Sequence, residues 1–196
     1  MLRDVLFDIG QNYLSESTKE LTANSFAERV RKNGKDALFA AVGDANLRYK
    51  ASVGQGNWAA VPWLGIFNPE STTSATHGIY VVYLFAADFQ SVYLCQGQGV
   101  TKVKEEFGRG QIDELQRRAA LIRARAPEHE KSFVSGSVSL GGSTNLAKEY
   151  DSAVAYYKEY SLKNLPENAV LERDLKEAVR LYETLIARGG TDNFES

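Results

Sequence analysis

The sequence has little cysteine, little proline and no long apolar run: its 196 residues include one cysteine and four prolines. A lone Cys95 excludes an intrachain disulfide and a zinc site built from cysteines. No apolar stretch approaches the roughly 18 residues that a membrane span needs. The first residues also lack the basic, apolar and small-residue segments of a secretory signal. We therefore expect a cytoplasmic protein with no membrane partner.

An excess of positive charge is also missing. The chain has 23 Lys and Arg against 25 Asp and Glu, which gives a formal net charge of −2. Proteins that bind duplex DNA usually carry a basic excess, so the total argues mildly against nucleic acid. A local patch is sufficient, however, and the stretches 29–35 and 102–131 are locally basic. Acidic residues interrupt the second stretch, which favours a solvated helix face there.

Signatures of catalysis are sparse. His77 and His129 are too far apart in sequence to form a local metal clamp. The glycines in 97–100 and 141–144 lack the spacing and the lysine of a phosphate-binding loop. The segment Asp174-Leu-Lys matches a fragment found in nucleases, but its amphipathic surroundings indicate a helix and not a strand end. We therefore expect no catalytic residue, no metal and no cofactor in this chain.

The periodicity of the chain predicts an α+β fold. Helical spacing of apolar residues marks the segments 1–43, 109–126, 146–157 and 171–186. Alternating or β-branched residues predict strands at 47–53, 78–85, 91–95 and 133–140. We expect a mixed, largely antiparallel central sheet that is covered by the N-terminal and C-terminal helices.

Smaller signals refine this picture. The second helix should begin near Asn24, where Ser25 and Glu28 have the spacing of a capping box. The polar segment 68–78 has no period and predicts a loop. We expect a single domain over 1–190, with 1–43 as its helical N-terminal part and 191–196 as a frayed tail or truncated linker.

The stretch 52–66, SVGQGNWAAVPWLGI, combines two tryptophans with flexible glycines. The Gly-x-Gly-Asn sequence suits a tight loop with backbone at positive φ. Tryptophan often anchors a hydrophobic core, which is one interpretation. The other is an apolar slot, formed by Trp58, Trp63 and Tyr80, beside a loop that approaches a ligand.

The run 50–67, followed after a loop by 78–89, resembles the N-terminal DNA-binding domain of McrB, a modification-dependent restriction protein. The family pattern is a strand, Gly-x-Gly-Asn, an aromatic, a spacer and apolar-Pro-Trp, and then Gly-Ile-Tyr with Asp-Phe after the strand. All of these parts occur here in that order. The first 43 residues extend beyond the shortest members of the family.

This resemblance implies that the chain recognises modified cytosine, 5-methylcytosine or 5-hydroxymethylcytosine, in duplex DNA by base flipping. In the family, an aromatic and apolar pocket takes the base and a loop residue fills the gap left in the helix. The implied pocket residues are Trp63, Tyr80, Leu84 and, as a further candidate, Phe133. Gln55 occupies the gap-filling position, which is aromatic in the family, and Trp58 should pack beneath the loop. The expected contacts to the DNA backbone are Gly54, Gly56, Asn57, Arg48, Lys50, Lys102 and Lys104.

The resemblance also implies partners. Cleavage would require a nuclease or NTPase module, in the same protein or in a partner, as in type IV restriction systems. The alternative is a protein-interaction or regulatory domain that uses the tyrosine-rich C-terminal amphipathic helices. This alternative requires that the helices supply a surface for a partner and do not simply cover the sheet.

Overall fold

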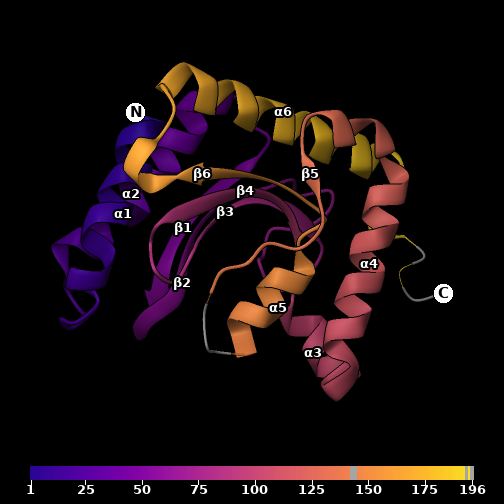
Figure 1. Ribbon diagram of the computed structural model, residues 1–196, viewed down its shortest axis with the longest axis horizontal. Helices are drawn as coiled ribbons and strands as arrows, with labels where there is room; N and C mark the ends of the chain where they lie inside the picture. Colours follow the sequence, from indigo (N-terminus) through magenta and orange to yellow (C-terminus); the bar gives the residue numbers. More distant parts are fainter. Residues whose placement is uncertain (142–144, 193, 195–196) are drawn as a thin grey trace.

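A computed structural model describes residues 1–141, 145–192 and 194 of the chain (Figure 1). The helices are α1 (Leu2–Glu16), α2 (Ser25–Val42), α3 (Thr101–Phe107), α4 (Gln111–Arg125), α5 (Asn145–Ala153) and α6 (Asn168–Ala187). The strands are β1 (Arg48–Gln55), β2 (Asn57–Phe67), β3 (Ile79–Phe85), β4 (Ser91–Gln98), β5 (Val134–Ser135) and β6 (Tyr156–Ser161). Short 3₁₀ turns cover Gly108–Gly110, Pro127–Lys131 and Leu162–Asn164. Within the described ranges, no helix is both long and apolar enough to cross a membrane.

The strands form one sheet in the order β1-β2-β3-β4-β6-β5. Each strand pair among the described residues is antiparallel. The first four strands follow one another in the sheet because short turns join β1 to β2 and β3 to β4, and such turns pair neighbouring strands antiparallel. The predicted α+β fold with a largely antiparallel sheet is therefore confirmed.

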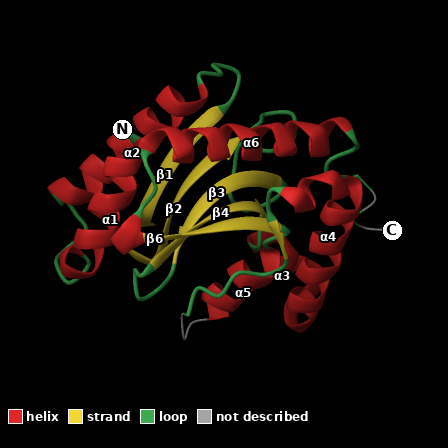
Figure 2. Ribbon diagram, turned by 45° about the horizontal axis from the view of Figure 1, so that its top comes forward, coloured by secondary structure: helices red, strands yellow, loops and turns green. Residues whose placement is uncertain are grey.

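The helices lie in two groups on either side of the sheet (Figures 1 and 2). On one face, α2 packs so closely that a Cβ added at Gly34 would lie 2.8 Å from the Cβ of Ala51 in β1. The same face carries Lys158 of β6, whose Nζ lies 3.0 Å from Asp174 of α6. α3, α4 and α5 form the second group, and α5 covers part of the opposite face. The N-terminal and C-terminal helices thus cover the sheet as predicted.

The start of α2 differs from the predicted capping box. Asn24 is the N-cap, with extended backbone, and its side chain accepts a hydrogen bond from the Ala27 N–H at 2.9 Å. Ser25 is already the first helical residue, so it does not cap the helix. The predicted capping box at Ser25 and Glu28 is wrong, although the helix begins where the sequence placed it.

The region after α4 departs furthest from the prediction. The segment expected to remain helical up to Tyr157 turns into β6, which pairs with β4 from Gln96↔Tyr156 to Ser91↔Ser161. The strand expected over 133–140 is reduced to Val134–Ser135, which pairs with the start of β6. α3 was not predicted. The alternating pattern of 156–161 overlaps with the helical spacing just before it. The segment forms a strand because it pairs with β4.

In the tail, where a frayed end was expected, Phe194 is 3% exposed. Its ring centroid lies 5.6 Å from the Arg118 guanidinium carbon and 5.3 Å from that of Arg125. Both arginines belong to α4, so this residue packs on the second helix group.

Candidate nucleic-acid interface

The hairpin between β1 and β2 turns at Gly56. Gln55 pairs with Asn57 across the turn, and Gly54 and Gly56 have φ of 110° and 74°. This confirms the predicted positive φ. Gln55, Gly56 and Asn57 are exposed. The tip therefore presents the Gln55 side chain and the neighbouring backbone to solvent.

The base of the hairpin is held by the N-terminal helices. The Tyr13 hydroxyl of α1 donates to backbone carbonyls of both strands, at 3.2 and 2.7 Å. The Trp58 Nε1 donates to the carbonyl of Lys19 at 2.8 Å, and Arg31 Nη2 of α2 donates to that of Gly54 at 2.9 Å. Trp58 thus packs beneath the loop, as predicted, and contacts with the N-terminal helices position the tip.

A bulge separates the two tryptophans. Ser52 pairs with Trp63 and Gly54 pairs with Trp58, so one residue of β1 stands opposite four residues of β2. In a regular ladder the partners of Ser52 and Gly54 would share a face of the sheet. Here Trp58 packs against α1 and α2, whereas Trp63 faces the other side. Pro62 lies inside this bulge, where its missing N–H is tolerated.

Three of the predicted pocket residues line one cavity. Trp63 and Leu84 are paired neighbours on β2 and β3, and Tyr80 lies four residues before Leu84. The full lining consists of Trp63, Ala75, Tyr80, Val82, Leu84, Gly97, Gln98, Tyr150, Ala153 and Val154. The cavity volume is about 10 Å³, close to the smallest that holds a single water molecule. The structure thus brings these three residues to one cavity, which is closed.

The ring of Tyr80 lines the cavity. Its hydroxyl lies 3.1 Å from the carbonyl oxygen of Ala75 and 3.2 Å from that of Gln98, so it donates to the backbone. Burial raises the pKa of Tyr80 far above its ordinary value. The residue therefore acts as an apolar, neutral wall and not as a proton donor or acceptor.

Phe133 is not among the residues that line the cavity. Its ring lies 4.9 Å from Lys158 Nζ, on the side of the sheet that α6 covers. Because the segment after Phe133 does not form the expected strand, its side chain is not carried to the cavity. Tyr150 of α5 provides an aromatic wall instead. The sequence showed only that Tyr150 belongs to an apolar helix face.

Cations line the edge of the sheet beside the hairpin. Arg48 and Lys50 of β1 border a groove of about 700 Å³ with Arg31 and Lys35 of α2, and Trp63 reaches the same groove. The groove lining contains no Asp or Glu. This is the local basic patch that the near-neutral total charge conceals.

Lys102 and Lys104 lie elsewhere, on α3. Lys104 Nζ is 2.8 Å from Oε1 of Glu149 in α5. Lys102 is exposed and borders a separate cleft of about 380 Å³ that also contains Glu106 and Arg118. The predicted backbone contacts therefore divide into two groups, one beside the hairpin and one on α3.

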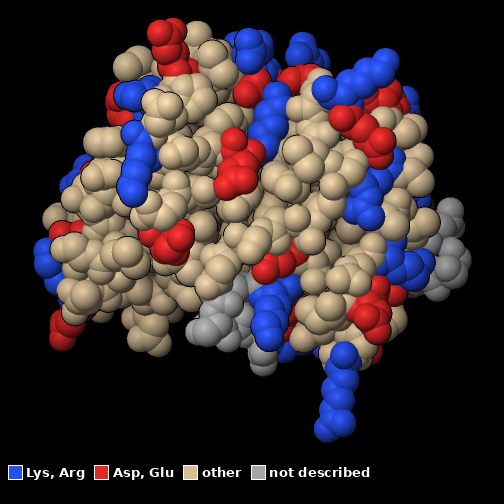
Figure 3. Space-filling model, in the orientation of Figure 1, with Lys and Arg blue, Asp and Glu red and all other residues tan. Residues whose placement is uncertain are grey.

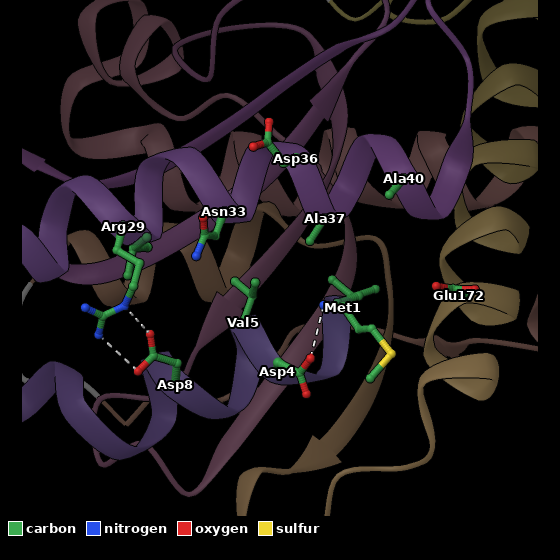
Figure 4. A pocket seen from close by; sticks show the side chains of 12 residues that line it. Met1, Asp4, Val5, Asp8, Arg29, Asn33, Asp36, Ala37, Ala40 and Glu172 are labelled. Carbon is green, nitrogen blue, oxygen red and sulfur yellow. Dashed lines mark hydrogen bonds and ion pairs between the residues drawn. The ribbon is translucent and has the colours of Figure 1, made fainter.

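Another hollow, of about 790 Å³, lies between α1 and α2 and reaches α6 (Figure 4). Its walls carry Asp4, Asp8, Asp36 and Glu172. The guanidinium of Arg29, which points into it, lies 3.0 Å from Asp8. An acidic rim repels phosphate. Acidic and basic side chains are interspersed over the face seen in Figure 3. By the residues that line them, the groove beside β1 suits a polyanion better than this hollow.

The remaining reactive groups have structural surroundings. Cys95 is fully buried, and burial raises the pKa of its thiol. Asp174 is 4% exposed and bound by Lys158 and Tyr160, whereas Lys176 points to solvent. In the described part of the chain, no group of three or more His, Cys, Asp and Glu could hold a metal ion. In the nuclease-like segment Asp174-Leu-Lys, Asp174 is thus a side chain of helix α6 that binds two residues of the sheet.

The C-terminal helix α6 uses its apolar face for the core. It buries Leu171, Leu175, Ala178, Val179, Leu181, Tyr182 and Leu185. The Tyr182 hydroxyl accepts a hydrogen bond from the Asn68 N–H at 3.0 Å. These tyrosine and leucine side chains cover the sheet and leave no apolar stripe on α6 for a protein partner.

A family model described as MrcB-like, N-terminal domain, matches residues 8–187. The match begins within α1 and ends at the last residue of α6, so it includes the helices that hold the hairpin. No curated protein matches the chain.

Proposed function

The chain belongs to the family of MrcB-like N-terminal domains, and from this premise we propose that it is a DNA-binding specificity domain. It recognises modified cytosine, 5-methylcytosine or 5-hydroxymethylcytosine, in duplex DNA by base flipping. Its binding directs a type IV restriction endonuclease whose nuclease or NTPase module lies in another part of the protein or in a partner. The chain itself performs no cleavage.

The observation that carries this proposal is the position of the cavity beside the exposed hairpin tip. Trp63 pairs with Ser52, three residues before Gln55. At about 3.4 Å per residue, the tip lies roughly 10 Å along the strand from the cavity wall. A flipped base needs an aromatic pocket and a side chain that enters the vacated space. Trp63 and Gln55 supply these two parts on one rigid hairpin.

Gln55 determines how the vacated space is filled. Its amide both donates and accepts hydrogen bonds, so it can bind the orphaned guanine or an adjacent base pair. It cannot stack as an aromatic residue would. We therefore assign Gln55 a polar gap-filling role, which makes binding sensitive to the bases next to the modified cytosine.

The DNA backbone binds along the edge of the sheet. Arg48 and Lys50, with the neighbouring cations of α2, neutralise phosphates and release counterions. Gly56 and Asn57, both exposed at the tip, add backbone contacts, and Gly56 allows a close approach because it has no side chain. Such contacts place the duplex without reading its sequence, which leaves discrimination to the pocket.

An electrophoretic mobility shift with matched duplexes tests the proposal. Three oligonucleotides of one sequence carry cytosine, 5-methylcytosine or 5-hydroxymethylcytosine at a single position. We expect a modified duplex to bind more tightly than the unmodified one. Equal affinities would refute the recognition of modified cytosine, and no binding at low salt would refute DNA binding as a whole.

Trp63→Ala is the matching variant. Stacking of one base on an aromatic side chain contributes about 1–3 kcal/mol, so the preference for modified DNA should fall by roughly 5-fold to 150-fold. Affinity for unmodified duplex should change little. Phe7→Ala, which removes an aromatic ring of α1 that is 45% exposed, is the control. Thermal melts of both variants establish that they fold.

A further inference from the structure

The cavity that would receive the base must open, and its walls differ in how they can move. Its floor belongs to β2, β3 and β4, each of which pairs with a strand on both sides. Moving that floor breaks ladder hydrogen bonds. Its roof is Tyr150 and Ala153 of α5, with Val154 directly after the helix. Ala75, in the loop between β2 and β3, completes the wall, and the Tyr80 hydroxyl of the floor binds its carbonyl oxygen. The wall that can move without breaking contacts to the floor is therefore α5.

In the closed position, a buried carboxylate of α5 has a lysine of α3 as its counterion. Glu149, next to Tyr150, is 1% exposed. Its Oε1 accepts hydrogen bonds from Lys104 Nζ at 2.8 Å and from Gln111 Nε2 at 3.0 Å. These contacts tie α5 to α3 and to the first residue of α4. A buried carboxylate is strongly destabilising when it loses its counterion, so Lys104 stabilises the closed roof.

The two partners of this ion pair differ in accessibility. The Lys104 side chain is 55% exposed, whereas that of Glu149 is 1% exposed. An anion in solution can therefore reach the ammonium without entering the protein. α3 and α5 also lie together, on the side of the molecule away from α6 (Figures 1 and 2). A phosphate and Glu149 thus compete for the same ammonium group.

We propose that Lys104 and Glu149 are positioning residues that couple a contact with the DNA backbone to the opening of the base pocket. This inference rests on the proposed function. When a phosphate binds Lys104, Glu149 loses its counterion and α5 moves outward until water reaches the carboxylate. This movement takes Tyr150 away from the cavity. Because coupling is reciprocal, an open roof also strengthens the binding of phosphate to Lys104.

The first test is hydrogen exchange of the α5 amides in the free protein. In Lys104→Met, exchange should be roughly 10-fold to 100-fold faster than in the wild type, because Glu149 is left without its counterion. Lys102→Met, on the same helix, is the control and should leave α5 exchange unchanged. Wild-type exchange in Lys104→Met would refute the proposal.

The double variant Lys104→Met with Glu149→Gln separates charge from packing. The neutral amide needs no counterion, so the double variant should regain the slow exchange of the wild type. If it exchanges as fast as Lys104→Met alone, Lys104 acts by packing and the proposed role is wrong. Glu149→Gln alone should be at least as protected as the wild type, which keeps the comparison valid if Lys104→Met folds poorly.

The second test adds an unmodified duplex oligonucleotide at low salt. Binding should accelerate α5 exchange at least about tenfold in the wild type and leave it unchanged in Glu149→Gln. Unchanged or slower exchange in the wild type would refute the coupling while leaving DNA binding intact. An absence of binding would refute both the proposed function and the coupling. The free-protein comparison would still decide whether the loss of the Glu149 counterion opens the roof.

Discussion

At the scale of single residues, Gly54 combines two requirements. Its φ is 110°, and a Cβ at this position would lie 2.1 Å from the carbonyl oxygen of Asn57. Gly56 also has positive φ, 74°, but no atom lies within 4 Å of its would-be Cβ. The two glycines of one motif therefore differ: Gly56 needs only conformational freedom, and Gly54 also needs space.

This difference predicts unequal effects of two substitutions. Gly56→Ala should reduce the free energy of unfolding by about 1 kcal/mol, because of its left-handed backbone. Gly54→Ala should reduce it by at least about 3 kcal/mol, since a steric clash adds to the strain. Urea denaturation of both variants measures the two values. Equal losses would show that the hairpin relaxes around Gly54.

Residues of the candidate pocket could be brought together from the sequence where their positions depend on the hairpin and the next strand. Trp63, Tyr80 and Leu84 meet because paired strands fix their register. The aromatic residue on the roof could not be predicted. The place of Tyr150 depends on how α5 docks, and distant side chains on α3 and α4 determine that docking.

Among the elements, β1 has a double role in the proposed interface. It forms half of the hairpin and supplies two of the cations in the groove. Lys50→Ala should therefore weaken binding to modified and unmodified duplex alike. Each lost phosphate contact lowers the slope of log affinity against log salt by about 1. Titrations at several salt concentrations measure the slope, and Lys176→Ala on α6 is the control. An unchanged slope would remove Lys50 from the interface.

The sequence predicted elements correctly where one period dominates. α2, α4 and α6 have long apolar faces, and β3 is rich in β-branched and aromatic residues. β6 was missed because Tyr156, Lys158 and Tyr160 alternate immediately after a helical pattern. The alternating segment becomes a strand only because it pairs with β4. Such pairing between segments far apart in the chain cannot be predicted from the local sequence.

At the scale of the whole molecule, Asp174 joins the helix layer to the sheet. Lys158 and Tyr160 of β6 both bind this carboxylate of α6, at 3.0 and 2.9 Å. Burial alone would raise the pKa of Asp174, but these hydrogen bonds lower it below its ordinary value. A carboxyl group whose pKa is lower in the folded state stabilises the fold at pH values above its unfolded pKa, about 3.9. The stabilisation is lost as pH falls through the folded pKa.

Asp174→Asn should therefore lower the free energy of unfolding by roughly 3 kcal/mol at neutral pH. Its difference from the wild type should shrink as the pH falls from about 3.9, where the unfolded carboxyl begins to bind a proton, down through the lowered pKa of the folded protein. Denaturation curves at a series of pH values measure this difference. Asp36→Asn, at an exposed position, is the control. A difference that does not vary with pH would mean that Asp174 stabilises the fold without its charge.

The position of β1 has one more consequence. This strand lies at one end of the sheet and pairs with β2 alone. An unprotected edge strand invites the same strand of a second copy and so promotes aggregation. Arg48 and Lys50 place like charges along that edge, where two copies would repel each other. The cations proposed to hold DNA therefore also oppose self-association, and replacing them to alter affinity would expose the edge.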